Sequence, residues 1–114
     1  MGNDDDLNLT LCEASDLSGE RVWELPVYAE YNDGMKGYFG DIRNIGDGGA
    51  GTIIGAMFLK HFIRDKNKWA HIDLASMSFE NGAVAYNPRK GANGWGVRLL
   101  VDTARILASS RLEE

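Results

Sequence analysis

Cysteine and histidine are scarce in this sequence of 114 residues. The single cysteine, Cys12, excludes a disulfide within the chain. The two histidines, His61 and His71, lie apart, and neither a Cys-x-x-Cys nor a His-Glu-x-x-His pattern is present, so the sequence carries neither of these metal-binding motifs. The scarcity of cysteine fits a reducing, cytoplasmic setting best.

Long apolar runs and clusters of positive charge are also missing. No run approaches the roughly 18 apolar residues that a membrane-spanning helix needs, and the acidic stretch Asp4–Asp6 stands where a signal peptide would be basic and then apolar. The net charge is -5 and the Lys and Arg residues are scattered, whereas nucleic-acid binding depends on clustered basic side chains. We therefore expect neither a membrane nor a nucleic acid as partner.

The length and the composition fit one folded domain. Hydrophobic residues make up 44% and charged residues 25%, which is the balance of an ordinary globular protein. We separate residues 1–18, whose structure the sequence leaves open, from residues 19–114. In the first segment Leu7–Leu11 alternates apolar and polar residues with a strand-like period, but the stretch is so short that a helix is equally open.

Three helices are expected after residue 18, while residues 27–44 could be irregular or contain a short helix. A short one over Arg21–Leu25 should end at Pro26, because proline disfavours helix in the residue before it. The stretch Thr52–Ile63 is apolar on most faces, which predicts a buried helix. Gly96–Ser110 is amphipathic and predicts a helix with one apolar and one ion-paired face. The apolar positions are Val97, Leu100, Val101, Ala104 and Ala108, with Leu99 and Ile106 widening the stripe, and the charged ones are Arg98, Asp102 and Arg105.

One strand is expected, over Trp69–Ala75, where Ala70, Ile72 and Leu74 share one face. Residues 76–94 contain too many turn signals for a regular element and should form a long surface loop. A lone strand leaves backbone groups unpaired on both edges. The sequence therefore looks like a piece of a larger α/β sheet.

Several motifs admit both a functional and a structural interpretation. The glycines of Gly46–Gly51 could cradle an anion ahead of a helix, but a tight turn is the commoner use of them. Asp4–Asp6 could bind a cation, although a solvated acidic terminus is more usual. His71 and Asp73 point the same way from the expected strand and could form a metal or acid–base pair, while a histidine beside a tryptophan is more often structural. Cys12 has no neighbouring base, which disfavours a nucleophile.

Five segments carry a family resemblance. They are Gly19-Glu20-Arg21-Val22-Trp23-Glu24-Leu25-Pro26, Asp41-Ile42-Arg43-Asn44, Gly49-Ala50-Gly51-Thr52-Ile53 with Phe58-Leu59-Lys60, Trp69–Ala75, and Lys90–Val101. In this order they resemble the C-terminal part of the leucyl (cytosol) aminopeptidase family, over about Gly19 to Val101.

The resemblance implies a catalytic half in which helices flank a mixed sheet. It also implies a homohexamer that removes N-terminal residues from peptides with two divalent metals, Mn or Zn. In the family the metal ligands and the catalytic Lys and Arg come from upstream segments that end in an Asn-Thr-Asp-Ala-Glu-Gly-Arg motif. This sequence contains no such motif, so no catalytic residue and no metal ligand is carried over, and we expect no cofactor bound by the chain alone.

The resemblance does carry over a substrate-pocket wall. In the family, the strand that matches Trp69–Ala75 and the turn after it help to wall the pocket for the first side chain of the substrate. By position, Ala75 and Ser78 would line this wall. The sequence departs from the family at Ser76, where glycine is usual, and at Tyr38, where an acidic residue is usual, and both changes bear on pocket shape and specificity.

We therefore expect residues 19–114 to be the C-terminal portion of an aminopeptidase catalytic domain. The fold class is α/β: the C-terminal fragment of a helix-flanked mixed sheet, largely helical with one strand. The chain should be inactive alone and should meet peptide substrates only in the complete enzyme. The alternative is a stand-alone, non-catalytic binding or interaction module that reuses this half-domain. The unpaired strand Trp69–Ala75 and the apolar face of Thr52–Ile63 also predict self-association.

Overall fold

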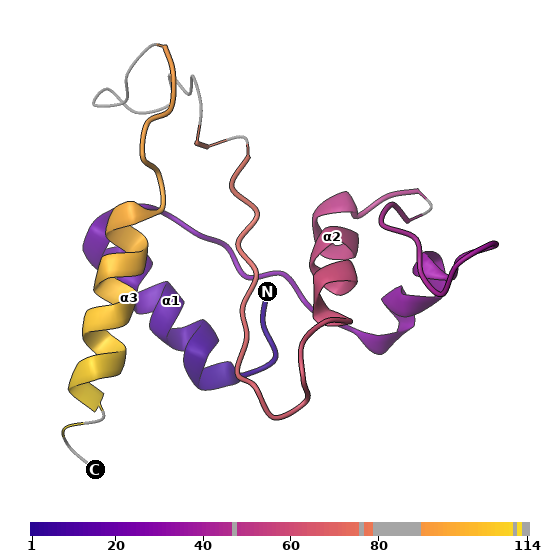
Figure 1. Cartoon of the computed structure of the whole chain (residues 1–114). Coiled ribbons are helices and arrows are strands. Elements are labelled where there is room, and N and C mark those ends of the chain that lie inside the picture. Colours follow the sequence, from indigo (N-terminus) through magenta and orange to yellow (C-terminus); the bar gives the residue numbers. More distant parts are fainter. Residues whose placement is uncertain (47, 76, 79–89, 111, 113–114) are drawn as a thin grey trace. The chain divides into compact units, whose positions relative to one another are not determined.

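The computed structural model describes residues 1–46, 48–75, 77–78, 90–110 and 112. Its regular elements are helix α1 (Asp5–Ser18), the 3-10 helix η1 (Ala29–Met35), α2 (Gly51–Lys60) and α3 (Val97–Ser110) (Figure 1). They belong to two compact units, the first made of Met1–Asn8 and Glu24–Asp73 and the second of Leu9–Trp23 and Leu74–Glu114. No helix in the described ranges is long and apolar enough to cross a bilayer.

The N-terminal segment forms helix α1, which settles the alternative that the sequence left open. Asp4 precedes the helix, and its Oδ1 accepts the N–H of Leu7 at 2.9 Å, so it caps the first turn. Asp5 and Asp6 follow in that turn, where negative charge interacts favourably with the helix dipole. The chain leaves the helix at Gly19, whose φ of 71° is the left-handed conformation that glycine adopts without strain.

The short helix expected over Arg21–Leu25 does not form. This stretch is irregular, and hydroxyl groups at the end of α1 accept its first N–H groups. The N–H of Glu20 donates to Ser18 Oγ at 3.1 Å. The N–H of Val22 donates to Ser15 Oγ at 3.0 Å. The prediction was wrong because few backbone hydrogen bonds could form in this stretch before Pro26, which has no N–H and disfavours helix in the residue before it.

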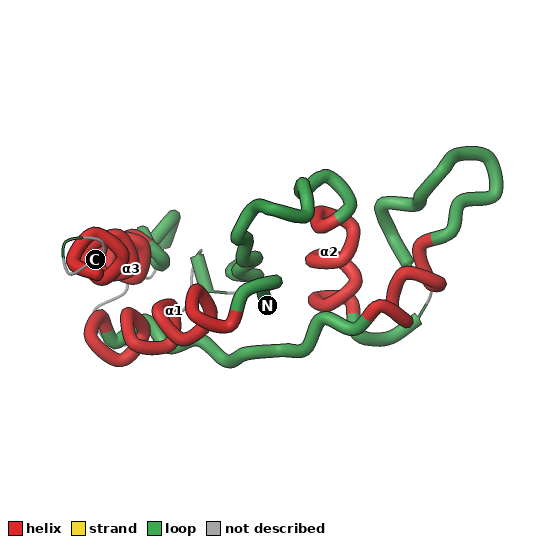
Figure 2. The backbone as a smooth tube through the Cα atoms, turned by 90° about the horizontal axis from the view of Figure 1, so that it is seen from below, coloured by secondary structure: helices red, strands yellow, loops and turns green. Residues whose placement is uncertain are grey.

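The core of the first unit lies between α2 and η1, which Figure 2 shows next to each other. Met35, Ile53 and Met57 are its buried side chains. The opposite face of α2 is more open, since Leu59 is 42% exposed. The helix predicted over residues 52–63 is therefore confirmed over Gly51–Lys60, but it is buried on one face and not on most of them.

The strand expected over Trp69–Ala75 is an extended segment with one short pairing. Residues 1–3 lie antiparallel to residues 69–71, and the N–H of His71 donates to the carbonyl oxygen of Met1 at 2.7 Å. The pairing stops there because the N-terminal segment turns into α1 two residues later. Among the residues that the structure describes there is no sheet, so the chain is largely helical, as predicted, and the mixed sheet is not seen.

Helix α3 forms where the sequence predicts it, but most of its apolar stripe is exposed in this chain. Leu99 and Thr103 are its buried residues. The charged face is formed in part: Arg105 Nη1 lies 3.2 Å from Asp102 Oδ1, while Arg98 pairs with a residue outside the helix. Of the expected apolar stripe, Leu99 is buried and Ile106 is partly buried. The other positions are exposed, and they are Val97, Leu100, Val101, Ala104 and Ala108. Helical spacing identifies an apolar stripe but does not identify what covers it.

Candidate functional site

The two predicted pocket-wall residues, Ala75 and Ser78, lie in one tight turn of the second unit. The carbonyl oxygen of Leu74 accepts the N–H of Met77 at 2.9 Å and the N–H of Ser78 at 3.1 Å. Ser78 Oγ donates to the carbonyl oxygen of Ala75 at 3.4 Å. The Ala75 side chain is exposed and Ser78 is half-buried. The structure thus brings the two residues together, while Ser76 between them lies outside the described residues.

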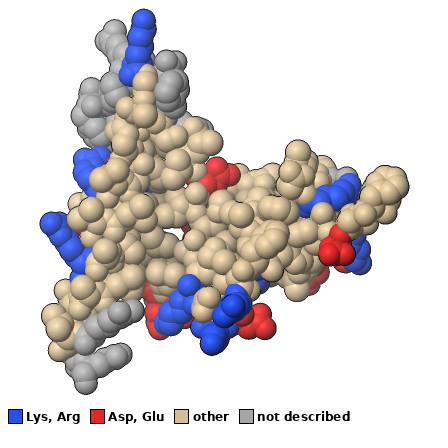
Figure 3. All heavy atoms as spheres, viewed as in Figure 1, with Lys and Arg blue, Asp and Glu red and all other residues tan. Residues whose placement is uncertain are grey.

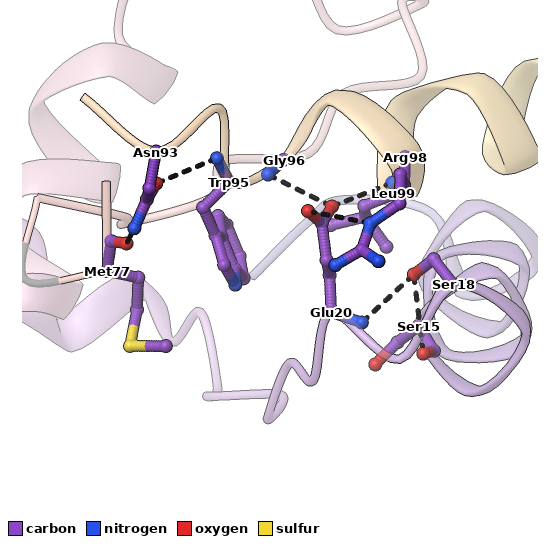
Figure 4. A network of polar contacts seen from close by, with 9 residues as sticks. All are labelled: Ser15, Ser18, Glu20, Met77, Asn93, Trp95, Gly96, Arg98 and Leu99. Atoms are coloured by element: carbon purple, nitrogen blue, oxygen red, sulfur yellow. Dashed lines mark hydrogen bonds and ion pairs between the residues drawn. The ribbon is translucent and has the colours of Figure 1, made fainter. Parts of the chain in front are cut away.

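Asn93 hydrogen-bonds this turn from beyond residues 79–89, the part of the expected loop that lies outside the described residues. Its backbone N–H donates to the carbonyl oxygen of Ser78 at 3.1 Å. Its side-chain Nδ2 donates to the carbonyl oxygen of Met77 at 2.6 Å, and its Oδ1 accepts the N–H of Trp95 at 2.9 Å (Figure 4). One residue therefore connects the turn to the segment that enters α3. The turn signals of residues 76–94 predicted a loop here but gave no indication of this contact.

Glu20 caps α3 from a distant part of the chain. Its side chain is 3% exposed, and its Oε2 accepts the N–H of Gly96 at 3.0 Å and that of Leu99 at 2.9 Å. Oε1 lies 3.4 Å from Arg98 Nε (Figure 4). A carboxylate at this end of a helix satisfies N–H groups that have no partner within the helix and interacts favourably with its dipole. The acid lies in the first segment of the family resemblance, but nothing in the sequence pairs it with α3.

The other motifs considered in the sequence take structural roles in the described residues. The ring of His71 stacks on that of Trp69, with centroids 6.3 Å apart, and its backbone pairs with the N-terminus. Asp73 is exposed. In the glycine-rich bend Gly48 and Ala50 both have left-handed φ angles, 74° and 59°, so the bend turns the chain into α2. Asp47 of this bend lies outside the described residues.

The acidic N-terminus is held by a lysine. Lys68 Nζ lies 2.9 Å from Asp4 Oδ2 and 3.9 Å from Asp6 Oδ2. The hydrogen bond from Lys68, helped by the N–H of Leu7, keeps the pKa of Asp4 below its usual value. On the face drawn in Figure 3, Lys and Arg atoms form separate groups, and several of these adjoin Asp or Glu atoms. The charges of Asp4–Asp6 therefore cap a helix and form ion pairs.

The described residues do not supply a metal-ligand set. Within residues 1–46, 48–75, 77–78, 90–110 and 112, no three His, Cys, Asp or Glu side chains gather where they could hold an ion. The two divalent metals that the resemblance implies therefore do not fit the donors on this part of the chain.

A shallow groove of about 320 Å³ lies in the second unit between the end of α1 and α3, but its lining includes neither Ala75 nor Ser78.

Residues 1–101 match the model of the cytosol aminopeptidase family, catalytic domain. The chain is 47% identical over 102 residues to a probable cytosol aminopeptidase of Geobacter sulfurreducens, covering 90% of this chain and 20% of that protein. It is 45% identical over 105 residues to the probable cytosol aminopeptidase of Geobacter sp. strain M21, covering 92% of this chain and 21% of the relative.

A solved structure agrees with the sequence comparisons. The chain superposes on a mutant of tomato leucine aminopeptidase with a TM-score of 0.78 and 36% identity, covering 90% of this chain and 19% of that one. The chain thus spans about a fifth of the length of the curated relatives that it matches.

Proposed function

We propose, because this chain belongs to the cytosol aminopeptidase family, that it is the C-terminal portion of a two-metal leucyl aminopeptidase that removes N-terminal residues from peptides. The observation that carries the proposal is the match over residues 1–101, together with the span of only about a fifth of the relatives. The chain is inactive alone, because the segments with the metal ligands are missing from it. In the complete enzyme those segments, and not this chain, would hold the two Mn or Zn ions, which would supply Lewis-acid chemistry for peptide hydrolysis.

The contribution of this chain is the wall that faces the first side chain of the substrate. The turn that holds Ala75 and Ser78 supports this assignment, since it presents both residues from one place. Ala75 is exposed and small, so a substrate side chain can approach its methyl group. A wall of this kind discriminates between substrates by the volume it leaves open.

The extended segment Trp69–Ala75 is, in the complete enzyme, one strand of a mixed sheet. Its pairing with residues 1–3 uses the N–H of His71 and the carbonyl oxygen of Trp69. The intervening N–H of Ala70 and the following N–H of Ile72 have no hydrogen-bond partner among the described residues, and they face the opposite edge in an extended chain. This open edge supports the addition of a further strand from upstream sequence.

Self-association belongs to the same proposal. Without the rest of the enzyme, the Trp69–Ala75 edge and the exposed apolar side chains of α2 are uncovered, and the family's homohexamer gives the complete protein several copies in contact. Neither membrane nor nucleic acid is a partner, and the setting is the cytoplasm, as the relatives' description as cytosol aminopeptidases supports. The alternative function, a stand-alone interaction module, is favoured by the outward apolar stripe of α3.

A graft distinguishes the two functions. The corresponding segment of the Geobacter sulfurreducens relative is replaced by this chain, and metal-dependent hydrolysis of leucine p-nitroanilide is measured beside the relative that lacks the segment. If the chain is a portion of an aminopeptidase, the graft should hydrolyse the substrate and the truncated relative should not. A graft that assembles and melts like the relative but hydrolyses nothing would support the interaction module instead.

A further inference from the structure

We propose that Asn93 is a positioning residue for substrate selectivity, because it fixes the turn Leu74–Ser78 that presents Ala75 and Ser78. This inference rests on the proposed function, since it assumes that the turn walls the substrate pocket. Asn93 does not touch the substrate in this account. It acts through the backbone of the turn.

The hydrogen bonds of Asn93 give it control over the end of the turn. Its N–H and its Nδ2 donate to two successive carbonyl oxygens, those of Ser78 at 3.1 Å and Met77 at 2.6 Å. Two adjacent peptide groups held by one residue cannot rotate independently. Within the turn itself, the N–H groups of Met77 and Ser78 both donate to the carbonyl oxygen of Leu74, at 2.9 and 3.1 Å, so Asn93 adds its two bonds at the opposite end of the turn.

The side-chain oxygen of Asn93 connects it to the start of helix α3. Asn93 Oδ1 accepts the N–H of Trp95 at 2.9 Å, and the next residue, Gly96, donates its N–H to the buried carboxylate of Glu20 at 3.0 Å. Gly94 and Gly96 have left-handed φ angles of 70° and 95°, which let the chain enter α3 at Val97, four residues after Asn93. Asn93 is thus a short connection between the turn and a capped helix (Figure 4).

The two functional ends of the asparagine side chain can be separated by substitution. Asn93→Asp keeps an oxygen for the N–H of Trp95 but loses the donor to Met77, and it places a carboxylate oxygen beside a carbonyl oxygen. Asn93→Ala loses both contacts. Asn8→Ala is a matched control in the first unit, because it also deletes a side-chain amide that donates one hydrogen bond, there to Glu24 Oε1 at 2.8 Å.

Amide hydrogen exchange on the 114-residue chain tests whether the turn is held. Exchange of the N–H groups of Met77 and Ser78 should accelerate about tenfold or more in both Asn93 variants, because the turn opens more often. Exchange of the Trp95 N–H should accelerate in Asn93→Ala only. Unchanged exchange at Met77 and Ser78 in both variants overturns the inference.

Selectivity is measured in the graft described above, as the ratio of kcat/KM for leucine and alanine p-nitroanilides. Both Asn93 variants should change this ratio by about fivefold or more, and Asn8→Ala should leave it unchanged while lowering the melting temperature. Ala75→Leu is the control for the wall itself. If Ala75→Leu changes the ratio and the Asn93 variants do not, the role of Asn93 is refuted while the proposed function stands. If none of the variants changes the ratio, the wall is refuted and the inference with it.

Discussion

Removing the carboxylate of Glu20 should destabilise the second unit strongly. In Glu20→Ala the N–H groups of Gly96 and Leu99, which both donate to Oε2 within 3.0 Å, lose their acceptor in a buried site. Each buried donor left without a partner costs about 1–3 kcal/mol, so the two together should lower the free energy of unfolding by about 2–6 kcal/mol. That is a large part of the roughly 5–15 kcal/mol that stabilises a typical domain.

Glu20→Gln separates the hydrogen bonds from the charge. A glutamine can place its single carbonyl oxygen where Oε2 lies, and so keep an acceptor for both N–H groups. It loses the negative charge at the N-terminal end of α3. The interaction of such a charge with the helix dipole stabilises a protein by up to about 2 kcal/mol in partly buried sites. We therefore expect Glu20→Gln to lower the free energy of unfolding by about 1–2 kcal/mol, clearly less than Glu20→Ala does.

The assay is urea unfolding followed by circular dichroism and tryptophan fluorescence, at a fixed protein concentration because self-association shifts the midpoint. Arg98→Ala is the control, because it removes the ion pair with Glu20 and leaves the two backbone hydrogen bonds to the carboxylate in place. The side chain of Arg98 is 51% exposed, and its Nε lies 3.4 Å from Glu20 Oε1. An ion pair with so exposed a partner contributes less than about 1 kcal/mol to stability. A Glu20→Ala chain within about 0.5 kcal/mol of the unmodified chain would refute the capping role.

Three further predictions concern the wall, the N-terminus and the open edge. Ala75→Leu in the graft should change the kcat/KM ratio between small and bulky first residues by more than about tenfold without a matching loss of stability, whereas equal loss on all substrates would indicate misfolding. The pKa of Asp4 is held low by Lys68, so the stability from this pair is present above the unfolded pKa near 3.8 and is lost as the pH falls through the lower folded value. Asp4→Asn should therefore make the free energy of unfolding depend less on pH in the acid range, and an unchanged dependence there would contradict the prediction. The purified chain should self-associate through the Trp69–Ala75 edge or the apolar face of α2. Light scattering across a dilution series should show oligomers, and Ile72→Pro should reduce them if the edge is used. A cooperatively melting monomer at micromolar concentration would contradict the prediction.

The sequence predicts local elements of this chain well where one stretch carries the whole signal. Helices α2 and α3 lie where their apolar periodicity places them, within a few residues at each end. The period of Leu7–Leu11 was too short to decide between helix and strand. In the structure the side-chain oxygen of Asp4 caps the start of α1, and Gly19 ends the helix in the left-handed conformation. Neither feature depends on the spacing of the apolar residues.

Contacts between distant residues could not be predicted in the same way. Glu20 and Gly96 are 76 residues apart, and an acid followed by a short irregular stretch gives no sign of the helix that it caps. Asn93 lies among many turn-forming residues, so its three hydrogen bonds are not distinguishable from the sequence. The outward stripe of α3 and the short pairing of Trp69–Ala75 share a cause, because in both cases the pattern identifies an interacting face and not its partner.

This chain belongs to the cytosol aminopeptidase family, and we propose that the segments with the metal ligands are not part of it. The most direct test is to assay the purified 114-residue chain on leucine p-nitroanilide with added Mn²⁺ or Zn²⁺, with contaminating aminopeptidase excluded by its different elution. We predict no metal-dependent turnover above the buffer control. Metal-dependent turnover that follows the chain through purification would contradict the account.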